Sequence, residues 1–318
     1  MKLVQPSVVR IVESDPLTQI ENAARTCYKS ESNKSAGSAK RMFDNLVKNK
    51  HTAMLEHASL VFQVFDTDYY DALKHNLSKY MNFTEHWIIS KADSRYTTPR
   101  FLMSGNIRAI NDSCIRQIYE AMIQAGLSDL LYPDSYPKEN ENWPNDELLP
   151  NTKIKVVDIS EIGDLSESEK LNHVYASFRI KTDRAVSHEI VRHRTMSFAQ
   201  QSQRYVRYNS DDIEFVEPSW YRSSTDDIKQ IFCNSLLQSE KAYNELMSNG
   251  CTAQEARCVL PNSTATEIVV TGNLKAWKHF INLRYKGTTG KPYPDMKIIS
   301  EQIYNELKVD PLCKDVIE

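Results

Sequence analysis

The sequence predicts an α+β fold in which a modest sheet is flanked by helices, with a long insertion between two early strands. Apolar residues recur at helical spacing near both ends of the chain, whereas β-rich runs are short and few. A long, largely polar stretch separates the first two of these runs. We therefore expect one domain over residues 1–318, with the insertion at about 66–173.

The composition is that of a globular protein in water. The chain has 318 residues, of which 41% are hydrophobic and 25% charged, and it has no apolar run near the roughly 20 residues of a membrane-spanning helix. The N-terminus lacks the features of a secretory signal, so we expect a cytoplasmic protein. The six cysteines are scattered and form no C-x-x-C pair, which indicates reduced structural thiols. A net charge of −3 argues against a protein that coats nucleic acid.

The first half of the chain opens with helices. Leu17, Ile20, Ala23 and Ala24 share one helical face within 16–28, and a similar pattern follows at 39–47. Two β-rich runs predict strands at 60–65 and 174–180. Between them, 137–150 is rich in Asn, Glu and Pro, which predicts an exposed loop. The chain shows no repeat at the periods of roughly 20 to 50 residues found in solenoids.

The second half alternates helices with another strand. Asp183 can cap a helix running towards Arg194, and a long amphipathic helix at 225–248 ends before Gly250. Thr252 and Glu255 form a capping box. A further strand and two further helices are expected at 267–270, 274–283 and 296–307.

An arginine-rich segment at 184–207 carries the chemistry. It holds five arginines and His193 against a single acid, Glu189, in a chain that is acidic overall. The planar donor fork of arginine suits phosphate and carboxylate, so the segment indicates a defined anion site. The neutral side chains among these arginines can hydrogen-bond to a base edge, and together the two groups predict a nucleotide site. These neutral residues are Ser197, Gln200, Gln201, Ser202 and Gln203.

Two other interpretations of this segment stay open. A run of charges can simply be a solvated face. Alternatively, the arginines with Phe198, Tyr205 and Tyr208 can bind single-stranded nucleic acid by stacking, although the overall acidity counts against this.

Metal binding is not expected. His188 and His193 are five residues apart, whereas the zinc-protease motif needs two histidines four apart on one helical face. In a second cluster with His51, the neighbours Glu56 and His57 point in different directions in either a helix or a strand. Core or capping histidines are the alternative interpretation of that cluster.

The arginine-rich segment resembles a family signature. Arg192-His193-Arg194, seven residues and then Ser202 match the R-H-R-x7-S motif of flavin-dependent thymidylate synthases. Stretches that are similar to other signatures of that family lie in the right order at 24–28, 51–58, 256–261 and 280–284, and the segment 104–109 resembles the insertion of longer members.

The resemblance implies a role for each matching residue. FAD is expected at His51, Ala53, Glu56, Arg192, His193, Arg194, Gln200, Asn282 and Arg284. Substrate dUMP is expected at Glu189, Arg192, Gln200, Gln201, Ser202, Gln203, Arg204, Arg257 and Lys297. Ser202 and Lys297 are also implied as catalytic residues, and no metal is implied.

The reaction implied is the conversion of dUMP to dTMP. Methylenetetrahydrofolate supplies the carbon unit and NADPH reduces the FAD, so no enzyme thiol is needed, and family active sites form at the interfaces of a homotetramer.

The sequence departs from the family pattern at several of these positions. Lys297 occupies the place of an arginine, which keeps the charge but loses the fork. Glu189 and Gln200 stand where many members have Gln and Glu, and Ala53 where some have a hydroxyl residue. A catalytically impaired relative that still binds flavin is therefore an alternative.

Overall fold

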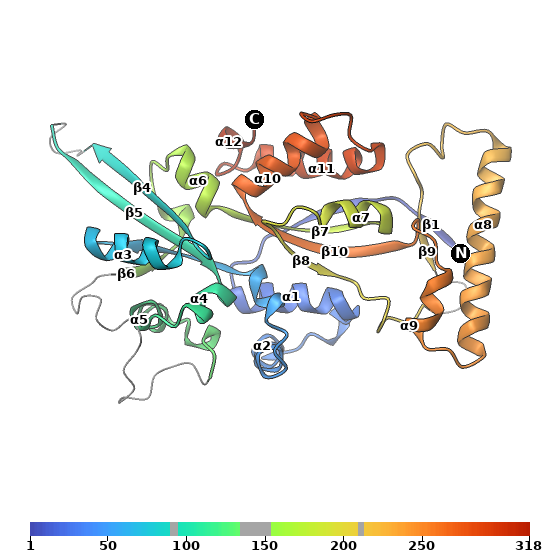
Figure 1. Cartoon of the computed structure of the whole chain (residues 1–318), viewed down its shortest axis with the longest axis horizontal. Coiled ribbons are helices and arrows are strands. Elements are labelled where there is room, and N and C mark those ends of the chain that lie inside the picture. The colour runs from blue at the N-terminus through green and yellow to red at the C-terminus, as the bar shows by residue number, and fades with distance from the viewer. Residues whose placement is uncertain (90–94, 134–153, 209–212) are drawn as a thin grey trace.

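The computed structural model describes residues 1–89, 95–133, 154–208 and 213–318. Figure 1 shows an elongated molecule in which three sheets lie one after another along the long axis, with helices on both sides. The loop expected at 137–150 lies outside the described residues.

The strands are short and mostly antiparallel. Two sheets have four strands each, in the orders β2-β7-β10-β8 and β4-β5-β3-β6, and a third pairs β1 with β9 in parallel. The strands are β1 (Lys2–Val4), β2 (Ser7–Ile11), β3 (Ser59–Val64), β4 (Asn82–Ile89), β5 (Thr97–Asn106), β6 (Ile154–Val157), β7 (Tyr175–Asp183), β8 (Ser197–Gln200), β9 (Glu214–Val216) and β10 (Ala265–Asn273).

The helices vary widely in length. The α-helices are α1 (Pro16–Tyr28), α2 (Ser38–Lys48), α3 (Thr67–Leu77), α4 (Ile107–Ser113), α5 (Arg116–Gln124), α6 (Glu167–His173), α7 (Arg184–Ile190), α8 (Asp226–Ser248), α9 (Ala253–Ala256), α10 (Leu274–Ile281), α11 (Pro294–Val309) and α12 (Lys314–Ile317). Three short helical segments matter below. They are the 3-10 helices η2 (Thr52–His57) and η5 (Arg257–Val259) and the π-helix η6 (Asn282–Lys286).

The sheet β2-β7-β10-β8, here called the central sheet, holds the arginine-rich segment. One face packs against α1 through a small group formed by Ala23, Ala199 and Val269. The other face carries α7, α10 and α11, and its core includes Phe178, Val270 and Trp277. Because both faces are covered, the strands are buried along most of their length.

The stretch expected to be an insertion builds most of a second sheet. Strand β3 pairs with β5 and β6, both of which come from this stretch, and has no pairing with the central sheet. The single modest sheet expected from the sequence is therefore three sheets, and the two early strands lie in different ones. Fully buried side chains such as Phe62, Tyr70 and Met103 form the core of this second sheet. The second sheet forms because β3 has apolar residues at alternate positions. These residues are buried only when β5, β6 and the helices of the same stretch cover them.

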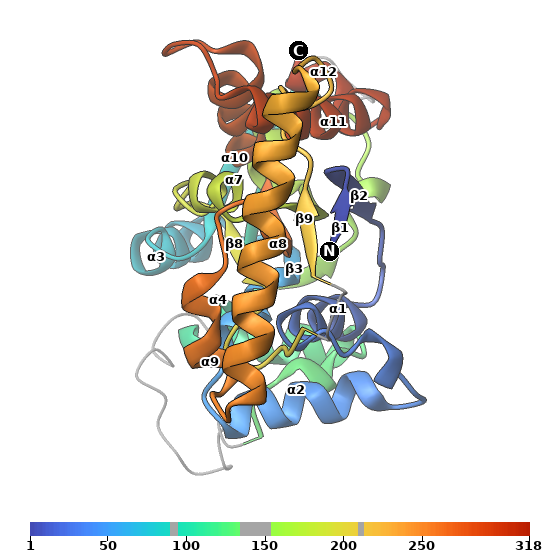
Figure 2. The same cartoon turned by 90° about the vertical axis from the view of Figure 1, so that its right-hand side faces the viewer.

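The third part of the molecule is one long helix beside two short strands. Figure 2 shows α8 standing across the end of the molecule, over β1 and β9. The helix contributes Leu236 and Tyr243 to a small core with Phe215. Glu240 of the same helix binds the chain's terminal ammonium at 2.7 Å.

Most elements lie within a few residues of their predicted bounds. One difference affects the site. The helix expected from Asp183 towards Arg194 ends at Ile190, because the amides of Arg192 and His193 turn back to the carbonyls of Glu189 and Ile190. The motif therefore lies in a tight turn between α7 and β8. Among the described residues, no helix is both long enough and apolar enough to cross a membrane.

Candidate active site

The arginine-histidine motif is held between two fixed elements. Asp183 ends β7 and caps α7, where its carboxylate accepts the amide of Val186 at 2.7 Å. The turn that follows leads into β8, which pairs with β10. Because sheet and helix fix both ends, the exposed side chains of Arg192 and Arg194 start from an ordered backbone. Neither forms an ion pair with any described residue, so both are available for an external anion.

His193 points inward and meets the turn after α10. Its Nε2 accepts a hydrogen bond from Nε of Arg284 at 3.1 Å, and Nη1 of Arg284 binds Glu189 at 2.7 Å. Burial lowers the pKa of His193 to about 4, and the charges of Arg284 and His279 act in the same direction. A neutral His193 and the side chain of Glu189 therefore hold the Arg284 fork in one orientation.

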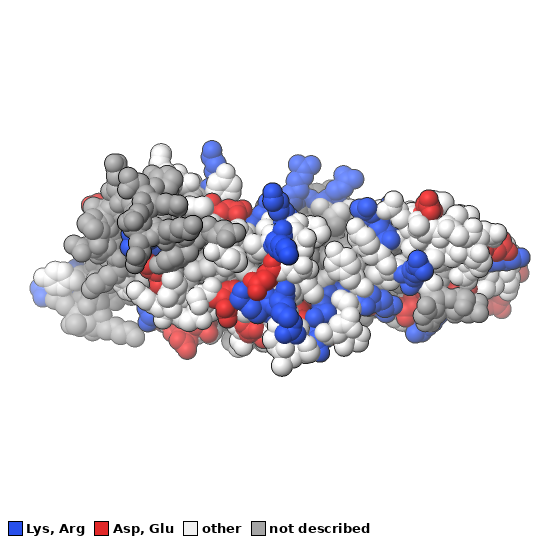
Figure 3. Space-filling view, turned by 90° about the horizontal axis from the view of Figure 1, so that it is seen from below, with Lys and Arg blue, Asp and Glu red and all other residues white. Residues whose placement is uncertain are grey.

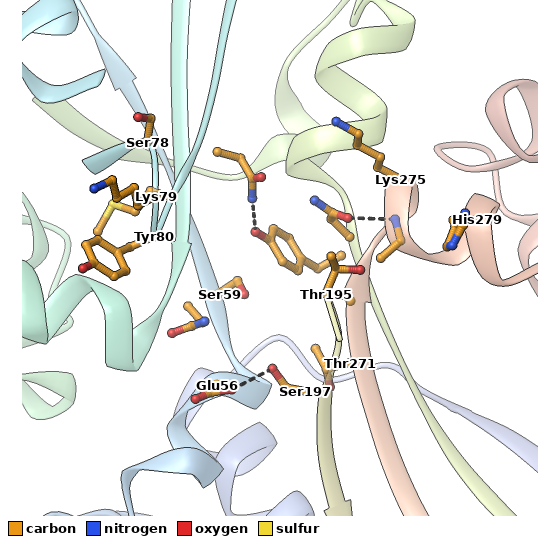
Figure 4. Close-up of a pocket in the computed structure, with 17 residues that line it drawn as sticks. Glu56, Ser59, Ser78, Lys79, Tyr80, Thr195, Ser197, Thr271, Lys275 and His279 are labelled. Carbon is orange, nitrogen blue, oxygen red and sulfur yellow. Dashed lines mark hydrogen bonds between the residues drawn. The ribbon is translucent and has the colours of Figure 1, made fainter. Parts of the chain in front are cut away.

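A hollow of about 500 Å³, here called the central cleft, opens between the central sheet and the second sheet. Figure 4 shows Tyr80 on one side and Lys275 with His279 on the other. Glu56 lies at one end and accepts a hydrogen bond from Ser197 at 3.2 Å. The cleft has the size of a small-molecule site, and its walls are polar where the two sheets meet.

His279 connects the cleft to the arginine cluster. Its ring lies 6.0 Å from that of His193, and His193 also packs against Phe280 at 4.8 Å. The arginine-histidine motif and the central cleft are therefore neighbours, because α10 contributes residues that contact both.

The end of β8 and the two residues after it are fixed by side-chain and backbone hydrogen bonds. Gln200 donates its amide to Ser187 at 2.9 Å and Thr266 at 3.3 Å. The buried Gln201 binds the backbone of Glu267, which extends the strand pairing. The amide of Ser202 then binds the carbonyl of Cys27 on α1 at 2.9 Å.

Beyond Ser202 the chain becomes exposed. The hydroxyl of Ser202 accepts the amide of Arg204, whose side chain donates to Gln254 of α9 at 2.8 Å. Gln203 is half-buried beside them. Tyr205 is exposed, and its ring lies 5.5 Å from that of Tyr28.

Arg257 lies near another arginine of the segment. It begins η5 and is exposed, whereas Arg184 is mostly buried and donates to the carbonyl of Gln201 at 3.0 Å. Burial lowers the pKa of Arg184, and the charge of Arg257 adds to this effect. Two neighbouring arginines of like charge favour an anion at this place.

The remaining predicted residues lie at the edges of this region. His51 and Ala53 are exposed at the start of η2, one turn before Glu56. Asn282 begins η6, and its carbonyl accepts the amide of Thr288 at 3.0 Å. Lys297 is exposed on α11, with its ammonium 5.8 Å from the ring centre of Tyr285.

The structure adds residues that the sequence did not single out. Asn106, Asn273, Lys275, His279 and Tyr80 all line the central cleft. The sequence carried a signal for one of them, since an asparagine such as Asn273 between a strand and a helical pattern is typical of a helix start. Nothing in the sequence indicated that Tyr80 would lie across from His279.

The charge distribution agrees with an anion site. Seen from below, Lys and Arg side chains gather near the middle of the face, next to a smaller acidic group (Figure 3). No group of three or more His, Cys, Asp or Glu side chains that could hold a metal ion occurs within the described ranges.

Comparison with known proteins gives one family. The model described as "Thymidylate synthase complementing protein" matches residues 9–129 and 134–310. A flavin-dependent thymidylate synthase of Geobacter sulfurreducens is 39% identical over 127 residues, which are 40% of this chain and 54% of that protein. One from Mycolicibacterium gilvum is 36% identical over 151 residues, covering 42% and 59%. The chain thus spans between half and two thirds of these relatives.

One solved structure aligns with nearly the whole chain, but at low sequence identity. The UMP/dUMP methylase PolB of Streptomyces cacaoi, bound with 5-Br dUMP, aligns over 99% of this chain and 96% of its own, with 16% identity and a TM-score of 0.42.

Proposed function

Because the chain belongs to the family described as thymidylate synthase complementing protein, we propose that it is a flavin-dependent thymidylate synthase. In this proposal it is a methyltransferase that converts dUMP to dTMP, with methylenetetrahydrofolate as carbon donor and NADPH as reductant of FAD. One observation carries the proposal. The segment from Arg192 to Arg204 presents neutral polar groups and two arginines, Arg192 and Arg194, that have no ion pair among the described residues, from a rigid turn beside the central cleft.

The residues present suit a flavin. The central cleft has room for a ring system and offers Glu56, Ser197 and Asn273 as hydrogen-bonding groups. Arg192 and Arg194 lie at the next turn and can bind its phosphates. Reduced FAD, when bound, supplies hydride chemistry. We assign the supporting positions His51, Ala53, Gln200 and Asn282 to the same group as part of the proposal.

The substrate would lie along the segment after β8. Gln201 fixes the backbone, so that Ser202 and Gln203 can face the uracil edge. The phosphate of dUMP would then meet Arg204 and Arg257, which lie on two different elements.

Polarisation of the uracil ring needs a fixed cation, and the resemblance assigns that role to Lys297. Arg284, which it assigns to FAD, is held by Glu189 and His193, so its orientation is set before any ligand arrives. Lys297 lies on the helix that packs against η6 and would add positive charge from the other side. A preorganised charge costs no reorganisation when negative charge develops on the ring.

The cysteine beside this segment is a poor nucleophile. The backbone carbonyl of Cys27 accepts the amide of Ser202. Burial raises the pKa of the Cys27 thiol to about 11, and a thiol nucleophile needs the opposite shift. This supports a mechanism in which hydride chemistry, not covalent attack by cysteine, builds the methyl group.

We also propose a homotetramer in the cytoplasm. The long helix α8 exposes Ile228, Ile231 and Leu237, which is the kind of surface that subunit contacts cover.

The visible absorption spectrum tests the proposal. We expect the purified protein to show oxidised flavin, and anaerobic NADPH to bleach it, after which dUMP and methylenetetrahydrofolate should give dTMP. A protein that stays colourless after FAD is added would refute the proposed function. Flavin that bleaches without any dTMP formation would identify an impaired relative.

A further inference from the structure

The second sheet repeats the design of the central sheet. Read from the outer edge, β6-β3-β5-β4 matches β2-β7-β10-β8, and every pairing in both is antiparallel. The order along the chain agrees in a strand, a helix, an edge strand, a further strand and a helix, but β9, α8 and α9 come between β8 and β10 in the second unit. The outer strand β6 follows the first unit in the chain, whereas β2 precedes the second. We call β3 to α4 the first unit and β7 to α10 the second unit.

The strand registers are the same in both units. Ser59 pairs with Asn106 at the mouth of the first unit, as Tyr175 pairs with Asn273 in the second. On the other side of the middle strand, Asn82 pairs with Ser104 as Ser197 pairs with Thr271. A slip of one residue would turn every side chain over, so a shared register indicates a shared fold.

The sequences at the two mouths agree. Ser104-Gly105-Asn106 corresponds to Thr271-Gly272-Asn273, and each asparagine caps the following helix at 2.8 and 3.0 Å. A side chain in place of Gly105 would meet Met81 at 2.9 Å, and in place of Gly272 it would meet Met196 at 3.1 Å. Met81 and Met196 themselves occupy corresponding places before β4 and β8.

The two units contact each other reciprocally. His57, two residues before β3, binds Thr271 of the second unit at 2.9 Å. His173, two residues before β7, binds Ser104 of the first unit at 2.8 Å. Each histidine thus reaches the matching hydroxyl of the other unit, as in the interface of a two-fold dimer. The chain therefore contains two copies of one unit, facing each other about an internal two-fold axis.

Each unit has a cleft at the corresponding place. Asn273, Lys275 and His279 of the second unit line the central cleft. Their counterparts Asn106, Arg108 and Asp112 line a second hollow of about 640 Å³, here called the outer cleft. The two clefts share Glu56, Tyr80 and Asn106 in their walls, so they lie side by side, and we call the pair the groove.

The outer cleft has different chemistry because the first unit lacks the arginine-histidine motif. Leu77-Ser78-Lys79 stands where the second unit has Arg192-His193-Arg194. Tyr80, 69% exposed, offers a ring for stacking at the boundary between the clefts. Arg108 lies between Glu56 at 2.8 Å and Asp112 at 3.5 Å, and its bond to Glu56 raises its pKa. The amides of Asn76 and Asn106 complete the wall.

These groups suit a nucleoside joined to phosphate. An exposed aromatic ring can stack on a base, amides can bind its edge, and a carboxylate such as Asp112 can bind ribose hydroxyls. Lys79 lines the central cleft next to Tyr80 and adds its charge to those of Arg192 and Arg194, to which the proposed function assigns the phosphates. Each cleft alone has the volume of a site for one drug-sized ligand, roughly 300 to 1,000 Å³, so the groove as a whole suits a longer one.

We propose that the outer cleft binds the adenosine half of the dinucleotide whose flavin half occupies the central cleft. In this proposal the two units have the same fold but bind different halves of FAD. The second unit binds the flavin half, and the first unit binds the adenosine half. This inference rests on the proposed function, because that function names FAD as the cofactor.

The test compares FAD with FMN, which lacks the adenosine half. Ser113→Trp fills the outer cleft from a residue that does not line the central one, and Asp112→Ala removes the carboxylate. Measured by flavin fluorescence, we expect FAD affinity to fall by about tenfold or more in Ser113→Trp, and FMN affinity to stay within about twofold. Exposed residues outside both clefts, Ser128→Trp and Asp71→Ala, are the matched controls.

Each outcome decides the assignment. Equal losses for FAD and FMN, or no loss of FAD affinity in either variant, would overturn it. Weakened NADPH binding with unchanged FAD binding would assign the outer cleft to the reductant and also overturn it. A wild-type protein that binds neither FAD nor FMN would instead refute the proposed function, and this is seen before any variant is made.

Discussion

Arg284 donates a hydrogen bond to Nε2 of His193 at 3.1 Å, and since arginine has no lone pair to offer, His193 must present an unprotonated nitrogen. A protonated imidazole would face the guanidinium with a like charge. The low pKa of His193, about 4, keeps this contact intact at neutral pH.

The contact predicts the effect of releasing Arg284. Glu189→Gln removes the charge that binds Nη1 of Arg284 at 2.7 Å but keeps a hydrogen-bond acceptor. We expect kcat to fall by about tenfold with little change in flavin content, because orientation of a fixed charge contributes mainly in the transition state. Steady-state kinetics with a flavin count on the same sample will check this. An unchanged kcat would remove the Arg284 cluster from the chemistry.

Arg194 is predicted to hold the cofactor. It is exposed beside the central cleft and has no acid partner among the described residues, so Arg194→Ala should leave the fold intact and empty the flavin site. The ratio of visible to ultraviolet absorbance measures occupancy. Arg222→Ala, at an exposed arginine paired with Glu217 elsewhere, is the control. Full occupancy in Arg194→Ala would contradict the assignment.

Lys297 is predicted to assist turnover more than binding. We expect Lys297→Ala to slow turnover more than it weakens dUMP binding, and Lys297→Arg to restore or raise activity, because arginine supplies the donor fork. Kinetics and dUMP titration of the two variants will distinguish the effects. If turnover of Lys297→Ala equals that of the wild type, Lys297 lies outside the site.

Buried histidines predict lower stability in weak acid. Burial lowers the pKa values of His57, His173 and His193 to about 4, against an ordinary value of 6.5. Between pH 6.5 and 4 the unfolded chain binds more protons than the folded one, so the free energy of unfolding falls as the pH is lowered through this window. It should be insensitive to these groups above pH 7. Denaturant titrations at several pH values will show the slope, and His57→Gln should make it shallower. An equal slope in that variant would exclude His57 as a source.

A buried ion pair predicts a strongly destabilising substitution. Arg100 makes two hydrogen bonds of 2.6 Å to the fully buried Glu169 and two more to the carbonyls of Gly163 and Asp164. Arg100→Met would leave Glu169 charged without its partner, at a cost of about 3–5 kcal/mol. Thermal and urea unfolding will measure it. A loss below about 1 kcal/mol would show that the pair is replaceable.

Local signals in the sequence located most helices. Apolar residues at helical spacing predicted α1 from Pro16, and in the structure the carboxylate of Asp15 caps this helix by accepting the amides of Leu17 and Thr18. The capping box of Thr252 and Glu255 is also present. Such signals depend only on neighbouring residues, so they survive without knowledge of the fold.

Pairing between distant strands was beyond the sequence patterns. Strand β8 has four residues inside the arginine-rich segment, where polar side chains hide its alternation. The likeness of Ser104-Gly105-Asn106 to Thr271-Gly272-Asn273 was present in the sequence, but unequal spacing between the units conceals a repeat. Only the sheets show that His57 and His173 meet hydroxyls of the opposite unit.

The excursion through α8 gives the two units different folding routes. In the first unit, β4 ends at Ile89 and β5 begins at Thr97, so the pair is nearly local. In the second unit, β8 ends at Gln200 and β10 begins at Ala265, with α8 between them. Closing a longer loop costs more entropy and slows pairing. During synthesis on the ribosome, all residues of the first unit are made before those of β10. The first unit can therefore fold first and act as a template for the second unit.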